Sequence, residues 1–150
     1  MSAFLELSNV SKNYSSPEGG EGVEVFSKVD LQLSEGSSAA IVGPSGSGKS
    51  TLLNIVGALD KPSGGEVKVG ALEVTGLNSG EAASFRNQTV GFIFQSHHLL
   101  PQCTVLENVM VPALAGYGKL TGDSLRARAE KLLDEVGLSH RLHHRPAEIS

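Results

Sequence analysis

The hydrophobic and polar positions of this 150-residue chain begin with the pattern of short strands separated by turns. FLELSNV at 4–10 and VFSKVDLQL at 25–33 flank an acidic, glycine-rich turn, PEGGEGVE at 17–24, and apolar residues alternate with polar ones along the second segment. Period-two alternation bounded by turn residues is typical of antiparallel strands that bury one face. The N-terminal part is therefore predicted to form an antiparallel β subdomain.

Further strands are predicted from four apolar segments. AAIV at 39–42 is a continuous apolar run, which favours a strand buried on both faces. GEVKV at 65–69 and ALEVTG at 71–76 form a second strand-rich stretch, and VGFIF at 90–94 is predicted as another strand.

Helical periodicity accounts for the remaining segments. LLNIVGALD at 52–60 predicts a buried helix that ends near Asp60, and a short polar helix is predicted from Ser79 to Arg86. The segments 105–116 and 124–138 also have helical spacing, and Gly137 is the expected C-cap of the second. One face of that helix is expected to carry Leu125, Ala129, Leu132, Leu133 and Val136.

Composition places the chain among soluble globular domains with one core. It is 39% hydrophobic and 19% charged, with a formal charge of −4, so a general electrostatic attraction to nucleic acid is not expected. Cys103 is the only cysteine, which excludes an internal disulfide and favours a reducing compartment. Because no apolar run approaches the roughly 20 residues that span a bilayer, a membrane role would require a partner protein.

GPSGSGKS at 43–50 matches the pattern of a phosphate-binding loop: Gly, four residues, Gly, Lys, then Ser or Thr. Its glycines permit backbone angles that turn amide hydrogens inward at the start of a helix, where anions bind. A glycine-rich turn that matches by accident is the alternative, but AAIV before it and LLNIVGAL after it supply the strand and helix that the motif needs. The predicted nucleotide-binding residues here are Gly43, Pro44, Ser45, Gly46, Ser47, Gly48, Lys49, Ser50 and Thr51.

Three residues of this loop have separate chemical roles. Lys49 brings a mobile positive charge to the β- and γ-phosphates, and the hydroxyl of Ser50 can ligate Mg²⁺. Thr51 lies in the first helical turn, where its amide can still face phosphate. A site for the phosphates of a nucleotide, with Mg²⁺, is accordingly predicted; the choice of ATP as the cofactor comes from the resemblance described next.

Three segments taken together resemble the ATP-binding subunit of an ABC transporter: LSNVSKNY, GPSGSGKSTLLNIVGALDKPSGGEV and VGFIFQSHHLLPQCTVLENVMVPAL. Within that family, HLLP and TVLENV look like the lipoprotein-releasing, Lol-type branch. Phe94 and Ser96 depart from the tyrosine and phenylalanine that Lol-type sequences often carry, so macrolide-export and cell-division relatives remain alternatives.

The resemblance implies roles for two further residues. Tyr14 falls where the family places an aromatic side chain that stacks on adenine; the alternative is a tyrosine that only covers the end of a sheet. Gln95 falls at the family's glutamine loop, where its amide oxygen can join the Mg²⁺ shell and act in catalysis with Lys49. The alternative for Gln95 is a polar residue that ends a strand.

Histidines invite a metal hypothesis, which the sequence disfavours. His97 and His98 are adjacent, but a zinc site usually needs three or four ligands. The remaining histidines lie in the run His140, His143 and His144, far from Cys103. Surface polar side chains are the favoured interpretation of all five histidines.

The resemblance also implies elements of ATP hydrolysis that this chain does not contain. These are a Walker B aspartate, an adjacent catalytic glutamate and a later switch histidine. Asp134-Glu135 has the wrong context because it lies within a predicted amphipathic helix. Ile149-Ser150 is the expected start of the signature motif, which then stops, so the chain alone is expected to be inactive and marginally stable.

The fold class expected from the resemblance is α/β: an incomplete P-loop NTPase (RecA-like) core with an antiparallel β subdomain and a partial helical subdomain. The expected division is a nucleotide-binding part at 1–95 and a helical part at 96–150. Expected partners are inner-membrane permease subunits and a second ATP-binding subunit in a head-to-tail dimer, at the cytoplasmic face of the inner membrane. Alternatives are a truncated nucleotide-binding protein without hydrolytic activity and a soluble ABC protein that acts on DNA or the ribosome; the balanced charge disfavours the latter.

Overall fold

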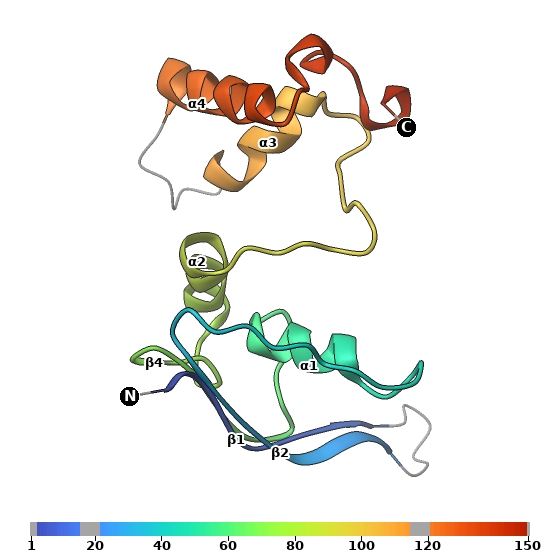
Figure 1. The fold of residues 1–150 in the computed structure, drawn as a ribbon, viewed down its shortest axis with the longest axis vertical. Helices are drawn as coiled ribbons and strands as arrows, with labels where there is room; N and C mark the ends of the chain where they lie inside the picture. Colours follow the sequence, from blue (N-terminus) through green and yellow to red (C-terminus); the bar gives the residue numbers. More distant parts are fainter. Residues whose placement is uncertain (1–2, 16–21, 115–120, 150) are drawn as a thin grey trace. The chain divides into compact units, whose positions relative to one another are not determined.

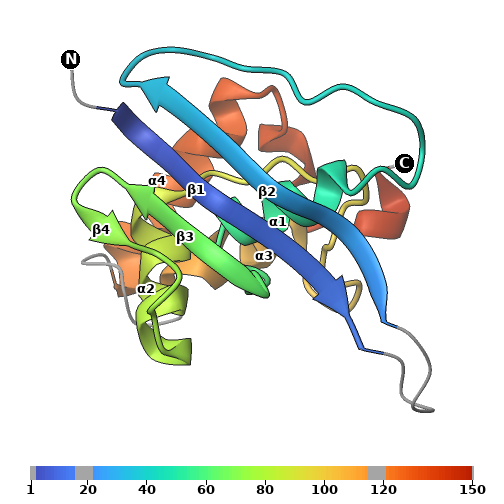
Figure 2. The ribbon, with the colours of Figure 1, turned by 90° about the horizontal axis from the view of Figure 1, so that it is seen from below.

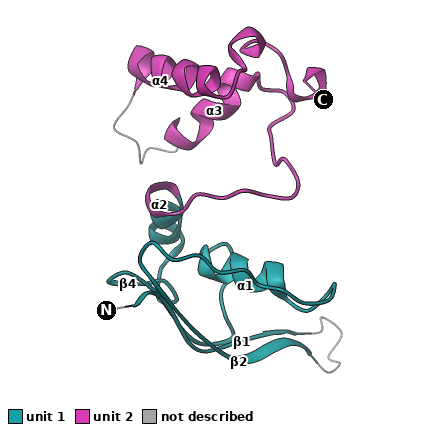
Figure 3. Cartoon of the chain, in the orientation of Figure 1, with its two compact units in different colours: residues 1–86 teal, residues 87–150 magenta. Residues whose placement is uncertain are grey.

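The structure, a computed structural model, describes residues 3–15, 22–114 and 121–149 (Figure 1). The chain divides into two units, residues 1–86 and 87–150, which Figure 3 colours separately. The boundary expected after residue 95 stays a prediction. In the described residues no helix is long and apolar enough to cross a membrane.

Within the part of the first unit that the structure describes, four antiparallel strands form one sheet (Figure 2). They are β1 (Ala3–Tyr14), β2 (Val23–Ser34), β3 (Gly64–Val69) and β4 (Leu72–Glu73), in the order β2-β1-β3-β4. The antiparallel subdomain predicted from the alternating pattern is thereby confirmed. The strand predicted over 71–76 is only two residues long.

The core of the first unit lies between this sheet and α1 (Lys49–Val56), with α2 (Ser79–Thr89) beside it. In register, Leu7 of β1 faces Leu31 of β2 and Val67 of β3. Helix α1 lies along one face of the sheet (Figures 1 and 2), and it ends at Val56 rather than near Asp60 as predicted. The buried apolar side chains are Leu7, Val10, Leu52, Ile55, Val67, Val74, Leu77 and Phe85.

Two of the predicted strands are absent, which corrects the expectation from their apolar runs. Residues 39–42 and 90–94 have no strand pairing, and their side chains are largely exposed: Val42 by 86% and Ile93 fully. A strand buried on both faces requires hydrogen-bonded neighbours, and none of the described residues supplies one to either segment. Apolar character alone was therefore an insufficient predictor.

In the described residues of the second unit, two helices and two short 3₁₀ turns follow the end of α2. They are α3 (Val105–Leu114), α4 (Gly122–Glu135), η1 (Ser139–Arg141) and η2 (Pro146–Glu148). Val105 and Leu106 pack against Ala129 and Leu133, with Val109, Met110, Leu138 and Leu142 around them.

The predicted apolar face of α4 is confirmed in part. Leu125, Ala129 and Leu133 are buried, but Leu132 is 37% exposed and Val136 is 68% exposed. Val136 lies beyond the last helical residue, and α3 covers the side of α4 that carries Ala129 and Leu133. Helix α3 therefore covers only part of the apolar face predicted for α4.

The C-cap of α4 is Val136, one residue before the predicted Gly137, and the helix is terminated at Gly137. The φ of Gly137 is +75°, and its amide donates to the carbonyl of Asp134 at 2.9 Å. The next amide, that of Leu138, donates to the carbonyl of Leu133 at 2.7 Å. This pair of bonds is a Schellman motif, which satisfies carbonyls at the helix end and favours glycine at the left-handed position.

The loop before α3 is organised by one side chain, Asn108. Its Nδ2 donates to the carbonyls of Leu100, Cys103 and Thr104 at 3.1, 3.2 and 2.9 Å. Its Oδ1 accepts from the amide of Leu100 at 2.8 Å. The side-chain amide of Asn108 thus links the HLLP and TVLENV segments by hydrogen bonds.

Candidate functional site

The predicted phosphate-binding loop forms an exposed turn that leads directly into α1. Gly46 and Gly48 both have φ of +81°, and Gly48 is the N-cap of α1. The amide of Leu52 donates to the carbonyl of Gly48 at 2.9 Å, which closes the first helical bond. Amide hydrogens of the helix start therefore remain available at this end, where anions bind.

The loop is packed tightly against the sheet at Gly48. A Cβ atom added to Gly48 would lie 2.7 Å from Cγ1 of Val25 and 3.0 Å from Cδ1 of Phe26, both on β2. At the other end of the loop, a Cβ on Gly43 would lie 2.9 Å from Oγ of Ser47. Glycine is therefore strongly favoured at position 48, where the left-handed φ and the β2 side chains both oppose a Cβ, whereas at position 43 a shift of the Ser47 hydroxyl would relieve the contact.

The ammonium group of Lys49 lies against the loop formed by residues 43–48. Its Nζ donates to the carbonyl of Pro44 at 2.6 Å and lies 3.4 Å from Oγ of Ser47. The first turn of α1 contains no acidic residue, so nothing there opposes an anion. Ser50 is exposed and Thr51 is half-buried. This donor set, one ammonium group, hydroxyls and helix-start amides, fits a polyphosphate group.

A second cluster of polar groups surrounds Tyr14 at the end of β1. The phenolic hydroxyl of Tyr14 donates to Oδ2 of Asp60 at 2.9 Å, and Lys12 Nζ donates to Oδ1 of the same carboxylate at 2.8 Å. Lys12 Nζ also donates to the carbonyl of Lys61 at 2.7 Å and lies 4.6 Å from the centre of the Tyr14 ring. Lys12 is buried and Tyr14 is 47% exposed.

The surroundings of Asp60 lower its pKa from the usual 3.8. Desolvation is the largest single influence and raises the pKa, but several contributions together exceed it. These are the hydrogen bonds from Lys12, Tyr14 and the Lys61 amide, with the positive charge of Lys12. Asp60 is therefore a carboxylate at neutral pH and forms an ion pair with Lys12.

The sequence predicts a role for Tyr14, which stays a prediction, but not the contacts that Tyr14 makes with Lys12 and Asp60. Lys12 could have been found, because residues two apart on a strand share one face. Asp60 could not, because it lies 48 positions from Lys12 and the sequence contains no sign of their pairing.

Gln95 lies in the second unit, in the irregular, exposed segment that follows residues 90–94. Nearby, the rings of Phe92 and Phe94 stack at a centroid distance of 5.3 Å, and His98 meets Phe94 edge-on at 4.7 Å. The predicted roles of Gln95 in Mg²⁺ binding and catalysis stay predictions. Ser150, the second residue of the expected start of the signature motif, lies outside the described residues.

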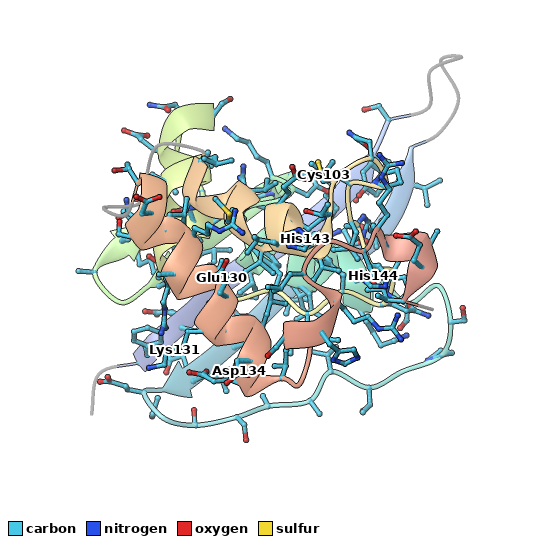
Figure 4. The ribbon with its side chains drawn as sticks, turned by 90° about the horizontal axis from the view of Figure 1, so that it is seen from above. Cys103, Glu130, Lys131, Asp134, His143 and His144 are labelled. Atoms are coloured by element: carbon cyan, nitrogen blue, oxygen red, sulfur yellow. The ribbon has the colours of Figure 1, made fainter. Side chains whose placement is uncertain are left out.

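The chemically reactive side chains of the second unit are spread over several elements. Figure 4 shows Glu130 and Asp134 along α4 and His143 and His144 after it, while Cys103 precedes α3. His144 Nε2 lies 3.1 Å from Nη1 of Arg141. Within the described residues no group of three or more His, Cys, Asp or Glu side chains is arranged to hold a metal ion.

Comparison with known proteins identifies several relatives. LolD 1, the lipoprotein-releasing system ATP-binding protein of Rhodopirellula baltica, is 55% identical over 147 residues, which cover 98% of this chain and 62% of that protein. LolD of Saccharophagus degradans is 54% identical over 147 residues and is covered to 62% of its length. The macrolide export ATP-binding/permease protein MacB 1/2 of Paracoccus denitrificans is 47% identical over 148 residues, 21% of its length.

Solved structures of an ATP-binding cassette are also similar. The dimeric post-hydrolysis structure of MJ0796 bound to ADP and Pi matches with a TM-score of 0.86 and 39% identity, over 97% of this chain and 63% of that one. This likeness confirms the α/β fold class. The chain thus spans less than two thirds of the length of these relatives. The model of the ABC transporter family matches residues 26–150, and the chain therefore belongs to that family.

Proposed function

We propose that residues 43–51 bind the phosphates of ATP and that Tyr14 stacks on its adenine base. The observation that carries the proposal is the turn at the start of α1, where Lys49 Nζ donates to the carbonyl of Pro44 and the first helical turn contains no acidic residue. Gly48 lies against Val25, and its lack of a side chain allows the loop to pack closely on the sheet. Membership of the ABC transporter family supports ATP as the nucleotide.

The donor set suits a magnesium nucleotide. The exposed hydroxyl of Ser50 and the amide oxygen of Gln95 are the groups of this chain proposed to hold Mg²⁺. When bound, Mg²⁺ neutralises charge on the β- and γ-phosphates and orients them. Lys49 contributes a second positive charge and is proposed to stabilise the charge that develops during phosphoryl transfer, with Gln95 as its catalytic partner.

For the protein as a whole we infer an ATP hydrolase that drives a membrane permease, in the release of lipoproteins from the inner membrane. The names of the LolD relatives support this assignment. The proposed partners are permease subunits and a second ATP-binding subunit in a head-to-tail dimer, and MJ0796, a dimeric cassette, supports the latter. The proposed location is the cytoplasmic face of the inner membrane, through the permease.

One alternative rests on a specific observation. A macrolide-export role is supported by the MacB relative, which is 47% identical.

ATP titration of the intact protein that carries this sequence tests the nucleotide site. Replacing Lys49 by Ala is expected to weaken ATP binding by about tenfold or more, because a charge-assisted hydrogen bond is lost. Lys68→Ala, which removes an equal charge from the exposed Lys68–Glu66 pair, is the matched control. Equal affinities of the Lys49→Ala variant and the unaltered protein would refute the site. Copurification with a permease, followed by release of a lipoprotein from vesicles, distinguishes the transport alternatives.

A further inference from the structure

The ring of Tyr14 is held from two directions by side chains that also hold each other. The Lys12 ammonium lies over one face of the ring, 4.6 Å from its centre, and the Tyr14 hydroxyl donates to Asp60 at 2.9 Å. The triangle is closed by the 2.8 Å ion pair between Lys12 and Asp60. These three residues, Lys12, Tyr14 and Asp60, are called the Tyr14 clamp below.

Burial of Lys12 makes the clamp more than a surface ion pair. Its side chain is only 9% exposed, whereas lysine is almost never buried without partners. Its ammonium has two strong acceptors, the Asp60 carboxylate and the Lys61 carbonyl, besides the ring. A desolvated cation over an aromatic face is attracted more strongly than an exposed one. The ring therefore has a defined position while remaining 47% exposed.

Lys12 lies over one face of the Tyr14 ring, the side chain remains 47% exposed, and the hydroxyl bond to Asp60 restrains the tilt of the ring. A planar base can stack only on an uncovered aromatic face, in an offset arrangement. The clamp thus makes Tyr14 a one-sided platform.

The clamp is also tied to the phosphate-binding helix. Asp60 lies in the turn that follows α1, and the amides of Leu59 and Asp60 both donate to the carbonyl of Asn54 within α1, at 2.8 and 3.2 Å. On the strand side, Ser63 exchanges two hydrogen bonds with the backbone of Asn13, at 3.0 and 3.1 Å. The helix that begins at Lys49 is in this way connected to the tyrosine through short, ordered links.

We propose that Lys12 and Asp60 are positioning residues that hold Tyr14 for one-sided stacking on the base of a nucleoside triphosphate. The inference rests on the proposed function, in which Tyr14 is the base platform. Its distinctive consequence is that Lys12 and Asp60 act on recognition of the base and not on binding of the phosphates.

Calorimetric titration of the intact protein with ATP and with inorganic tripolyphosphate, which has no base, separates these two contributions. Lys12→Met keeps an apolar stem without the ammonium, and Asp60→Asn keeps a hydrogen-bond acceptor without the charge. Each is expected to weaken ATP binding by about three- to tenfold, the size of a lost cation–π contact or hydrogen bond, with tripolyphosphate binding unchanged. Lys68→Met is the matched control for the loss of one positive charge on the same sheet.

A double variant tests whether the effect passes through the ring. Tyr14→Ala alone is expected to weaken ATP binding by about tenfold, the size of one stacked base. When Lys12→Met is added to Tyr14→Ala, no further loss of ATP affinity is expected, because the platform is already gone. Additive losses would overturn the inference.

The outcomes distinguish this inference from the proposed function. Equal weakening of ATP and tripolyphosphate by Lys12→Met, or no weakening of ATP, overturns the positioning role, and Asp60→Asn provides the same test should Lys12→Met fail to fold. If Tyr14→Ala weakens ATP binding while the Lys12 and Asp60 variants do not, only the inference is lost. If Lys49→Ala has no effect on either ligand, the proposed nucleotide site itself is refuted.

Discussion

Gly48 of the predicted phosphate-binding loop and Val25 of β2 are so close that a methyl group on Gly48 would force one of them to move. A Cβ on Gly48 would lie 2.7 Å from Cγ1 of Val25, a separation that real Cβ atoms essentially never show. The loop can approach β2 this closely because Gly48 has no side chain. This contact connects the antiparallel sheet to the start of α1, and so to the Lys49 ammonium.

Alanine at position 48 is expected to destabilise the protein and weaken ATP binding. The left-handed φ of +81° costs a non-glycine residue about 1–2 kcal/mol, and the contact with Val25 adds to this. Gly46→Ala is the matched control because Gly46 has the same φ but nothing within 4 Å of an added Cβ. Urea unfolding and ATP titration measure both effects, and an equal loss of stability in the two variants would contradict the crowding at Gly48.

Acid is expected to weaken the Tyr14 clamp in a defined pH range. Because the folded-state pKa of Asp60 is lowered, its ionised form stabilises the fold above the usual value of 3.8 and this stabilisation is lost as pH falls through the folded-state pKa. The free energy of unfolding of Asp60→Asn should therefore fall below that of the unaltered protein at neutral pH. The difference should shrink as the pH falls below the usual pKa of 3.8. A difference that stays constant across this range would exclude an ionised Asp60 as the cause.

Leu133 and Leu132 are neighbours in α4 that should respond very differently to truncation. Leu133 is 3% exposed and packs with Val105 and Leu106, whereas Leu132 is 37% exposed. Leu133→Ala is expected to cost about 2–5 kcal/mol and Leu132→Ala about 0.5 kcal/mol. Denaturant midpoints measure both, and a larger loss at Leu132 would mean that α3 covers the other side of α4.

Thr104 and Glu107 form a capping box at the start of α3. The Thr104 amide and hydroxyl donate to the Glu107 carboxylate at 2.7 and 2.9 Å, and the Glu107 amide donates to Thr104 Oγ1 at 3.2 Å. Thr104→Ala is expected to cost about 1 kcal/mol, while Thr104→Ser should cost little.

NMR titration of Glu107 gives a second measurement of the same cap. Its pKa is lowered first by the hydrogen bond from the Thr104 amide and then by that from the Thr104 hydroxyl. In Thr104→Ala the pKa should rise part of the way towards its usual 4.5, because the amide bond remains. An unchanged pKa would argue against the hydroxyl contact.

Features that depend on neighbours in the sequence were predictable. The alternating pattern of 25–33 predicted β2, and Gly137 predicted the end of α4. The turn that leads into α1 was predictable because its glycines and Lys49 occur at fixed spacing; phosphate binding by this turn stays a prediction. In each case the local sequence contains most of the relevant physical information.

Features that depend on distant partners were not predictable. Residues 39–42 and 90–94 were expected as strands, but a strand needs hydrogen-bonded neighbours as well as an apolar composition. The Tyr14 clamp was missed for the same reason, since Asp60 reaches Lys12 across 48 positions. Which apolar residues of α4 stay exposed depends on where α3 packs against it, and the spacing of apolar residues within α4 does not reveal this.

The hydrogen bonds of Asn108 make the loop before α3 sensitive to deamidation. Its Nδ2 serves three carbonyls at once, those of Leu100, Cys103 and Thr104. Hydrolysis of that amide, or a mutation to aspartate, exchanges one nitrogen for an oxygen, preserves the shape, and turns a donor into an acceptor. Three carbonyl oxygens would then face a carboxylate. A change of a few atoms that leaves the side-chain outline intact would release the loop that leads into α3.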